Sequence, residues 1–547
     1  MATLMERALP AALLTPVLTR GLGIREFRTA PIAESPTFLP LHQSSTQASV
    51  MDRTPTETAH CRASELGFHF LSIRDFHNAY QNGATTPERI AERVLADIAE
   101  SDRQELALCT FISCYADDLR SQAQEATQRY KEGRPRGLLD GVPIAVKDEV
   151  DMVPYPTTGG TSFLGSSPAQ TDSTVVERLR RAGAMLIGKT NMHEIGILPD
   201  SVNPHWGAVR NPYNVRHDAG GSSSGSAAAV AAGFCPVAIG AEGGGSIRIP
   251  AAFCGVVGVK PTFGRVSEAG ALPLCGSVAH LGPIAATVDD AALMYEVIAG
   301  PNPGDASTLD QPAPQLPSHK AGLKAVRIGI FQPWFSDADG EVTTACERVI
   351  KELVRMGATL VDVAIPELSL IRAAHGLTIH AEMAANMDQY DEGHRSDFSW
   401  RTRLMLANVR AMRSTDYIQA QRIRTRAIQH FLAALTAADV IATPTTPVTA
   451  PQIDERSLPH GRLNVGEIIN IMRFVNPMNI TGIPAITIPV GYGESGMPIG
   501  LQFAARPWEE SLLFELGYAA ESIVARTKPE VHFDLLRNVR VNAPCRK

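Results

Sequence analysis

The chain has 547 residues, of which 44% are hydrophobic and 20% charged, and its formal net charge is −7. This composition indicates a folded globular protein, because disordered chains combine low hydrophobicity with high net charge. The mild acidity, with a pI of about 6.1, argues against a nucleic-acid partner, which would require clustered Lys and Arg. No run reaches the ~18 consecutive apolar residues of a membrane-spanning helix, so we expect no transmembrane segment.

Eight cysteines are scattered along the chain, without a Cys-x-x-Cys pair or a Cys/His cluster at zinc-ligand spacing. We therefore expect free, mostly buried thiols, no metal and no cofactor. Free thiols favour the cytoplasm. The arginine-bearing N-terminus, residues 5–28, slightly resembles a mitochondrial-type presequence and keeps an organelle open.

The composition changes along the chain define the expected organisation. Residues 1–65 lack apolar periodicity and are predicted to be an extension outside the fold, either flexible, a targeting segment, or the result of a misassigned start upstream of Met51. Residues 66–530 are predicted to form one domain, and residues 531–547 a tail. Within that domain we expect a helical layer (66–135), a core with the main motifs (136–300), a variable helical region (325–430) and a C-terminal core (431–530).

The first predicted elements alternate between helix and strand. Thr86 is a plausible N-cap with Pro87 at the first helical position, and an apolar face follows it. A short apolar strand over 144–146 ends at Lys147. A helix capped by Asp172 follows, with Val175, Val176 and Leu179 facing inward, and then a strand over 184–187.

Strand patterns return at 235–242, 440–444 and 483–491, and residues 340–435 read as mostly helical. The basic amphipathic stretch 401–413 favours a solvated helix, with a partner interface or a membrane surface kept open. Alternating strands and helices predict an α/β fold. We expect a large mixed, mostly parallel sheet sandwiched by helices.

Glycine surrounds polar residues in loops at three places. Ser246 directly follows Gly243, Gly244 and Gly245. Three glycines allow the backbone to turn so that several N–H groups point one way, which a nucleophile with an oxyanion hole requires. A tight turn or a phosphate-binding loop is the alternative, although the Lys-Ser/Thr ending of a P-loop is absent.

A serine nucleophile needs a base, because its hydroxyl is nearly inert at neutral pH. Histidines occur nearby in sequence, and a lysine can also serve if burial keeps it neutral. Lys147 ends an apolar strand but precedes three acidic residues, so a surface lysine is the alternative. The run of Ser222, Ser223 and Ser224 between glycines could equally be a flexible linker or part of the site.

Together these loops resemble the amidase signature family. The resemblance rests on "GVPIAVKDEVD" (141–151), "GGSSSGSAAAVAAG" (220–233) and "GGGSIRIPAAFCGVVGVKPTFGR" (243–265), with supporting matches running in order to about residue 522. It implies that Ser246 is the nucleophile, Ser222 the bridging serine after a cis peptide bond, and Lys147 the base. The N–H groups of Gly243, Gly244, Gly245 and Ser246 would form the oxyanion hole.

The resemblance also implies supporting roles for Ser223 and for Arg248, which braces the nucleophile loop in the family. The usual acidic partner of that arginine is Asp, whereas this chain has Glu242. The implied reaction is hydrolysis of a carboxylic acid amide through an acyl-enzyme, without metal or cofactor. The expected partner is a small-molecule amide; peripheral membrane contact and a homodimer are kept open.

Within the family, "KDEVDMVPYPTTGGTSFL" (147–164) and the triple serine are most similar to the plant-type fatty acid amide hydrolases. This favours an N-acylethanolamine or another hydrophobic acyl amide as substrate. Met152, Tyr155, Ile197 and Leu198 are candidates for an acyl pocket, with simple core positions as the alternative. The other functions weighed are a short-chain or aryl amidase, the amidase component of a tRNA-dependent amidotransferase, and an inactive scaffold.

Overall fold

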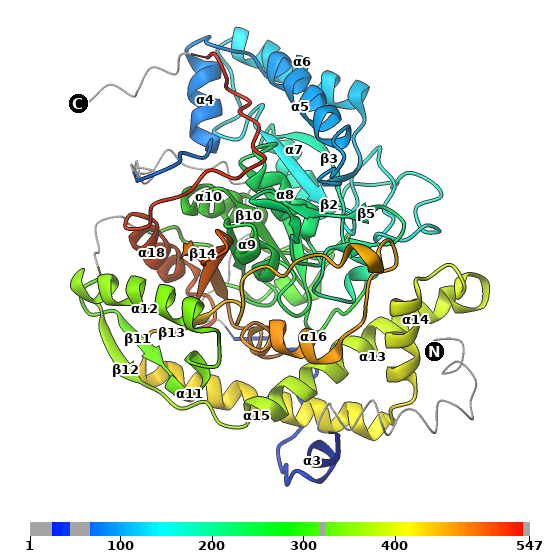
Figure 1. The fold of residues 1–547 in the computed structure, drawn as a ribbon, viewed down its shortest axis with the longest axis vertical. Coiled ribbons are helices and arrows are strands. Elements are labelled where there is room, and N and C mark those ends of the chain that lie inside the picture. Colours follow the sequence, from blue (N-terminus) through cyan, green and yellow to red (C-terminus); the bar gives the residue numbers. More distant parts are fainter. Residues whose placement is uncertain (1–23, 44–65, 318–322, 540–547) are drawn as a thin grey trace.

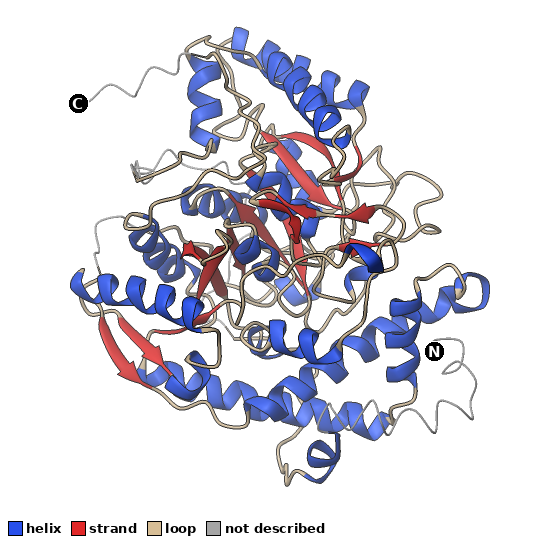
Figure 2. Cartoon of the chain, viewed as in Figure 1, coloured by secondary structure: helices blue, strands red, loops and turns tan. Residues whose placement is uncertain are grey.

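The computed structural model describes residues 24–43, 66–317 and 323–539 (Figure 1). A sheet of eleven strands runs through the middle of the molecule (Figure 2). In spatial order its strands are β1 (Phe111–Ser113), β3 (Met185–Thr190), β2 (Pro143–Lys147), β8 (Val237–Glu242), β10 (His280–Ala285), β9 (Val257–Lys260), β14 (Ala485–Tyr492), β15 (Pro498–Ala505), β13 (Val440–Pro444), β11 (Arg327–Ile330) and β12 (Thr359–Asp362). Two short ribbons pair β4 (Val202–Asn203) with β5 (Gly207–Ala208), and β6 (Arg210–Asn211) with β7 (Asn214–Asp218).

The expected large mixed sheet flanked by helices is confirmed, but its description as mostly parallel is wrong. Parallel pairing holds for β2 with β3 and β8, and for β11 with β12 and β13. All other neighbouring strands of the sheet pair antiparallel. The strand-helix-strand pattern read between 144 and 187 is parallel as expected; the error arose because the central pairs β8–β10 and β9–β14 join segments that are distant in sequence.

Helices flank the sheet, and their apolar sides form one large core with it. Against the sheet lie α8 (Ser224–Ala231), α9 (Arg248–Phe253), α10 (Val288–Ile298), α12 (Gly340–Arg355) and α18 (Glu510–Glu521), and α7 (Thr174–Arg181) packs on α10. At the top of Figure 1 are α4 (Ile73–Gln81), α5 (Pro87–Asp102) and α6 (Ala116–Lys131). The strands β2, β3 and β8 are buried along their whole length, which suits sheet strands covered on both faces.

Local sequence signals fix several helix starts. Thr86 caps α5 by accepting a hydrogen bond from the Arg89 N–H, and Pro87 occupies the first helical position, as expected. The predicted cap of α7 is one residue too early: Ser173, not Asp172, accepts from the Val176 N–H. Asp172 instead accepts from the Val153 N–H and pairs with Arg180, because a carboxylate outside the helix can reach both groups.

A second helical layer lies below the sheet in Figure 1. It contains α11 (Gln332–Phe335), α13 (Leu368–His394), α14 (Trp400–Arg410), α15 (Ser414–Ala437), α16 (Val465–Met472) and α17 (Asn476–Thr481). The basic stretch 401–413 supplies α14, whose Leu404 and Leu406 are buried. This helix packs on α13.

Part of the N-terminal extension belongs to this helical layer. Residues 24–43, with the short α3 (Ile24–Thr29), lie along α15 (Figure 1). Phe27 is fully buried in a cluster with residues of α13 and α15. Arg28 pairs with Asp416 at 2.6 Å, and Glu34 pairs with Arg426 at 2.7 Å. Residues 24–43 therefore pack on the fold, whereas the rest of the 1–65 segment lies outside the described residues.

Within the described ranges, no helix is long and apolar enough to cross a membrane. In the same ranges, no group of three or more His, Cys, Asp or Glu side chains is arranged to hold a metal ion. The six cysteines of the described residues have free thiols, and four of them are buried. Cys61 and Cys545 lie outside the described residues.

Candidate active site

Three loops bring Lys147, Ser222 and Ser246 to one place. Lys147 is the last residue of β2, Ser222 lies in the turn before α8, and Ser246 lies between β8 and α9. All three side chains line one small cavity. The three residues that sequence analysis placed in a catalytic group, separated by up to 99 positions, are thus brought together by the fold.

Lys147 is buried, with a side chain 1% exposed, rather than at the surface. Its Nζ lies 2.9 Å from Ser222 Oγ and donates at 2.9 Å to the carbonyl oxygen of Ala241. The peptide bond between Gly221 and Ser222 is cis, as the family resemblance implied. No hydrogen bond joins Ser222 Oγ to Ser246 Oγ among the described residues, so the contact from lysine to serine is made and the contact between the two serines is not.

Ser223 ties the second loop to the third. Its N–H donates to the Ser246 carbonyl at 3.2 Å, its Oγ donates to the Ala241 carbonyl at 3.0 Å and accepts from the Ala241 N–H at 3.2 Å. These bonds give Ser223 a supporting place beside the site. Ser224 begins α8, and its buried Oγ has no hydrogen-bond partner within the described residues.

The glycine run forms a set of available donors. Within the described ranges, the N–H groups of Gly243, Gly244, Gly245 and Ser246 donate to no other group of the protein. Glycine is required here: Gly245 has φ +116°, and a Cβ on Gly244 would lie 2.6 Å from His375 Cε1. Free, converging backbone donors beside a serine are what an oxyanion hole needs.

Glu242 accommodates its extra methylene without disturbing the loop. Its carboxylate pairs with Arg248 at 2.5 Å, and both side chains are fully buried. The same carboxylate accepts the N–H groups of Ile247 at 3.0 Å and Arg248 at 3.3 Å. Burial alone would raise the pKa of Glu242, but the Arg248 charge and these hydrogen bonds outweigh it and hold the pKa below its usual range. Arg248 also donates to Asn479 at 2.7 Å, so it connects the loop to α17.

The site contains acidic and imidazole groups that sequence analysis did not assign. Glu149 Oε2 lies 2.9 Å from Lys147 Nζ, and Glu268 lines the same cavity. His375 of α13 meets the carbonyl oxygen of Gly243 through Nε2 at 2.7 Å. Burial lowers the pKa of His375 to about 4, so the ring is neutral and Nε2–H donates. Glu149 follows Lys147 by two residues, a spacing that could have singled it out; His375 gave no such signal.

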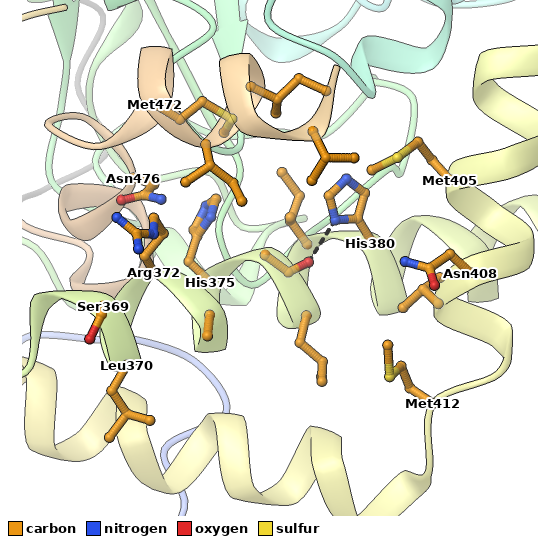
Figure 3. Close-up of a pocket in the computed structure, with 18 of the residues that line it drawn as sticks. Ser369, Leu370, Arg372, His375, His380, Met405, Asn408, Met412, Met472 and Asn476 are labelled. Atoms are coloured by element: carbon orange, nitrogen blue, oxygen red, sulfur yellow. Dashed lines mark hydrogen bonds between the residues drawn. The ribbon is translucent and has the colours of Figure 1, made fainter. Parts of the chain in front are cut away.

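A much larger cavity lies on the other side of His375. It has a volume of about 640 Å³ and is lined by α13, α14 and α16, with Glu26 and Ala30 of the N-terminal segment at its edge. Figure 3 shows His375 and His380 of α13, Met405 and Met412 of α14, and Met472 of α16 around this space. Ile379 lines both this cavity and the small one that holds the triad. The two cavities are therefore adjacent.

The expected acyl-pocket residues lie elsewhere. Met152 and Tyr155 are fully buried in the main core, and Tyr155 stacks on Tyr115. Ile197 and Leu198 belong to a separate buried cluster with residues of α13. None of the four lines either cavity. The apolar character that suggested them serves packing, and the cavity walls come from helices later in the chain.

The comparisons with known proteins agree with this geometry. The Amidase family profile matches residues 91–514. A fatty acid amide hydrolase of Oryza sativa subsp. indica is 39% identical, over 97% of this chain and 93% of its own length. The amidase component of a glutamyl-tRNA(Gln) amidotransferase from Thermosynechococcus vestitus is 34% identical, over 82% of this chain and 97% of its own. The structure of native peptide amidase from Stenotrophomonas maltophilia aligns with a TM-score of 0.72 and 30% identity, covering 85% of this chain and 98% of the other.

Fold, site and relatives thus define an amide-hydrolysing enzyme. The chain belongs to the amidase family.

Proposed function

We propose that this enzyme hydrolyses carboxylic acid amides with a long hydrophobic acyl group, of the N-acylethanolamine type, through an acyl-enzyme on Ser246. The single observation that carries the substrate class is the large cavity beside the nucleophile loop. Its volume of about 640 Å³ falls within the roughly 300–1,000 Å³ of small-molecule sites. The 39% identity to a protein named fatty acid amide hydrolase supports the same class.

The cavity lining suits a flexible aliphatic chain. Most of its walls are apolar side chains, namely Leu370, Leu377, Ile379, Leu404, Met405, Val409, Met412, Leu463, Val465, Ile468, Ile469 and Met472. Methionines adapt to irregular apolar shapes because their side chains are unbranched and polarizable. Each methylene buried against such walls contributes about 0.8 kcal/mol, so a long chain gains far more from this cavity than a short one.

The proposed chemistry uses the triad as a proton relay. Ser246 Oγ attacks the amide carbonyl while its proton passes to Ser222 Oγ and the Ser222 proton passes to Lys147 Nζ. The contact between Ser222 and Ser246 tightens when substrate binds, since catalytic hydrogen bonds are often long before that. The free N–H groups of Gly243 to Ser246 receive the oxyanion. The proton then returns through Ser222 to the leaving nitrogen, because an amine leaves poorly unless it is protonated. Water hydrolyses the acyl-enzyme.

Two other functions use the same triad. A short-chain or aryl amidase would gain little from the large cavity. An amidotransferase component is supported by the 34% identical relative of that kind, but that similarity covers less of this chain than the similarity to the fatty acid amide hydrolase. The apolar cavity therefore favours the hydrophobic acyl amide.

The substrate class is tested with purified protein and a panel of acetamide, an aryl acetamide, a long-chain acylethanolamide and glutamine. We expect kcat/KM to be highest for the long-chain amide. A clear preference for acetamide would refute the lipid class, and glutaminase activity alone would favour the amidotransferase.

The nucleophile is tested separately. Ser246→Ala should abolish both turnover and covalent labelling by a fluorophosphonate, which reacts with activated serines whatever the acyl substrate. Labelling that persists in this variant would remove Ser246 as the nucleophile.

A further inference from the structure

The amine of Lys147 has three polar neighbours, and only one of them is in the proposed triad. Ser222 Oγ, the Ala241 carbonyl oxygen and Glu149 Oε2 each lie 2.9 Å from Nζ. An ammonium has three donors, so the charged form of Lys147 can satisfy all three neighbours at once.

The neutral form is more constrained. A neutral amine has two N–H groups and one lone pair. The Ala241 carbonyl and the Glu149 carboxylate can only accept, so they take both N–H groups. The lone pair then faces Ser222 Oγ, which is the direction a base for Ser222 requires. Without Glu149, one N–H could turn toward Ser222 and compete with that orientation.

Glu149 supplies the negative charge closest to this amine. Glu268 lines the same cavity, but burial, then repulsion from Asp305, Glu149 and Glu382, raises the pKa of Glu268 well above its usual range. Its Oε1 has no hydrogen-bond partner within the described residues. The carboxyl of Glu268 is therefore neutral at pH 7.

The other titratable groups around the amine are neutral or already paired. Burial raises the pKa of Cys275 and lowers the pKa of His280, so both are neutral. Glu242 is paired with Arg248. Asp148, next to Lys147 in sequence, lies 3.4 Å from Lys189.

We propose that Glu149 is a positioning residue for the base: its carboxylate aims the Lys147 lone pair at Ser222 and stabilises the ammonium that forms when Lys147 accepts the proton. This inference rests on the proposed function of the triad. In the forward step the proton leaves Ser246, one proton moves from Ser222 to Lys147, and the resulting ammonium is balanced by Glu149. In the return step the same proton goes back toward the leaving nitrogen, and the neutral amine is restored.

The two roles of Glu149 predict two separate effects of Glu149→Gln. Loss of the fixed acceptor should lower the plateau rate. Loss of the charge disfavours the ammonium, so neutral Lys147 persists to lower pH and the acidic limb of the pH profile moves down. An opposite charge at this distance displaces a titration by about 1–3 pH units, so we expect the midpoint to fall by about one unit or more. A purely structural role would lower the rate without moving the midpoint.

The test measures the rate constant of fluorophosphonate labelling from pH 5 to pH 10, with Glu268→Gln as the matched comparison. Glu268→Gln replaces one neutral group by another in the same cavity, so its midpoint should stay at the wild-type value. An unchanged midpoint in Glu149→Gln, or an equal displacement in both variants, would overturn the proposal.

A third variant covers the case in which Glu149→Gln does not fold. Glu149→Asp keeps the charge and withdraws it by one methylene, so the plateau should fall while the midpoint stays nearer the wild-type value. A wild-type plateau in this variant would refute the positioning role. Labelling reports on Ser246 without an amide substrate, so a wrong substrate class does not affect the outcome. If Ser246→Ala is still labelled, the triad assignment fails instead.

Discussion

Gly376→Phe should shorten the acyl chain that the enzyme accepts. Gly376 lies within α13 and lines the large cavity, and a Cβ built on it meets no atom within 4 Å. The new side chain therefore points into open space that we assign to the acyl group. The fold should tolerate the change, because glycine inside a helix is less favourable than alanine by about 0.5–1 kcal/mol.

The size of the effect follows from the methylenes displaced. A phenyl group takes the place of roughly four methylenes, and at about 0.8 kcal/mol each the loss is about 3 kcal/mol. Since about 1.4 kcal/mol corresponds to a factor of ten, kcat/KM for a long-chain acylethanolamide should fall about 150-fold. An aryl acetamide, whose acyl group ends near Ser246, should lose little.

The chain offers a matched control on the same helix. Gly393 also has open space around a built Cβ, but it is exposed and does not line the cavity. Gly393→Phe should leave the ratio of long-chain to short-chain kcat/KM unchanged. If Gly376→Phe keeps the wild-type ratio while remaining folded by circular dichroism, the acyl group does not occupy this cavity.

Lys147→Ala should lose most activity near neutral pH and recover part of it at high pH, where solvent base can replace the amine; a pH-independent loss in the rate profile would argue against a base. Glu242→Ala leaves the fully buried Arg248 without its carboxylate and should lower the free energy of unfolding in urea by about 3–5 kcal/mol. Glu92→Ala, which breaks the exposed pair with Arg120, should cost no more than about 1 kcal/mol, and equal losses in the two variants would contradict the difference in burial. His375 has its pKa lowered to about 4 by burial, so the unfolded chain, with a histidine pKa near 6.5, binds the extra proton first and stability is lost as pH falls from 6.5 toward 4. Between pH 7.5 and pH 5 this amounts to about 2 kcal/mol, and His375→Gln should reduce the pH dependence of the unfolding free energy by that amount; parallel curves would show that His375 is not neutral when folded.

The parts of the structure that local chemistry dictates could be predicted from sequence. Thr86 and Pro87 specify the start of α5 because cap and first turn are contiguous. The motif around Ser246 could be recognised because a glycine run and a serine occupy one loop. The meeting of Lys147 with Ser222 came from family resemblance, since no local rule joins residues 75 positions apart.

The parts that depend on distant contacts could not be predicted. The acyl cavity arises where α13, α14 and α16 meet, and no single stretch of sequence carries its shape. Met152 and Tyr155 are apolar and near the lysine motif, but the sheet turns them into the core. Glu149 gave a misleading signal: the acidic neighbours suggested a surface lysine, whereas the fold buries the pair together.

The bonds of Ser223 have a consequence for how the enzyme can vary. By joining Ser246 and Ala241 through both backbone and side chain, Ser223 couples the bridging loop, the nucleophile loop and β8 into one rigid unit. The walls of the acyl cavity belong to other helices, which meet this unit through His375, Ile379 and Met472. Chemistry and substrate choice are therefore carried by separate parts of the fold, and side chains of α13, α14 and α16 can be exchanged to retune chain length while the reacting atoms keep their geometry.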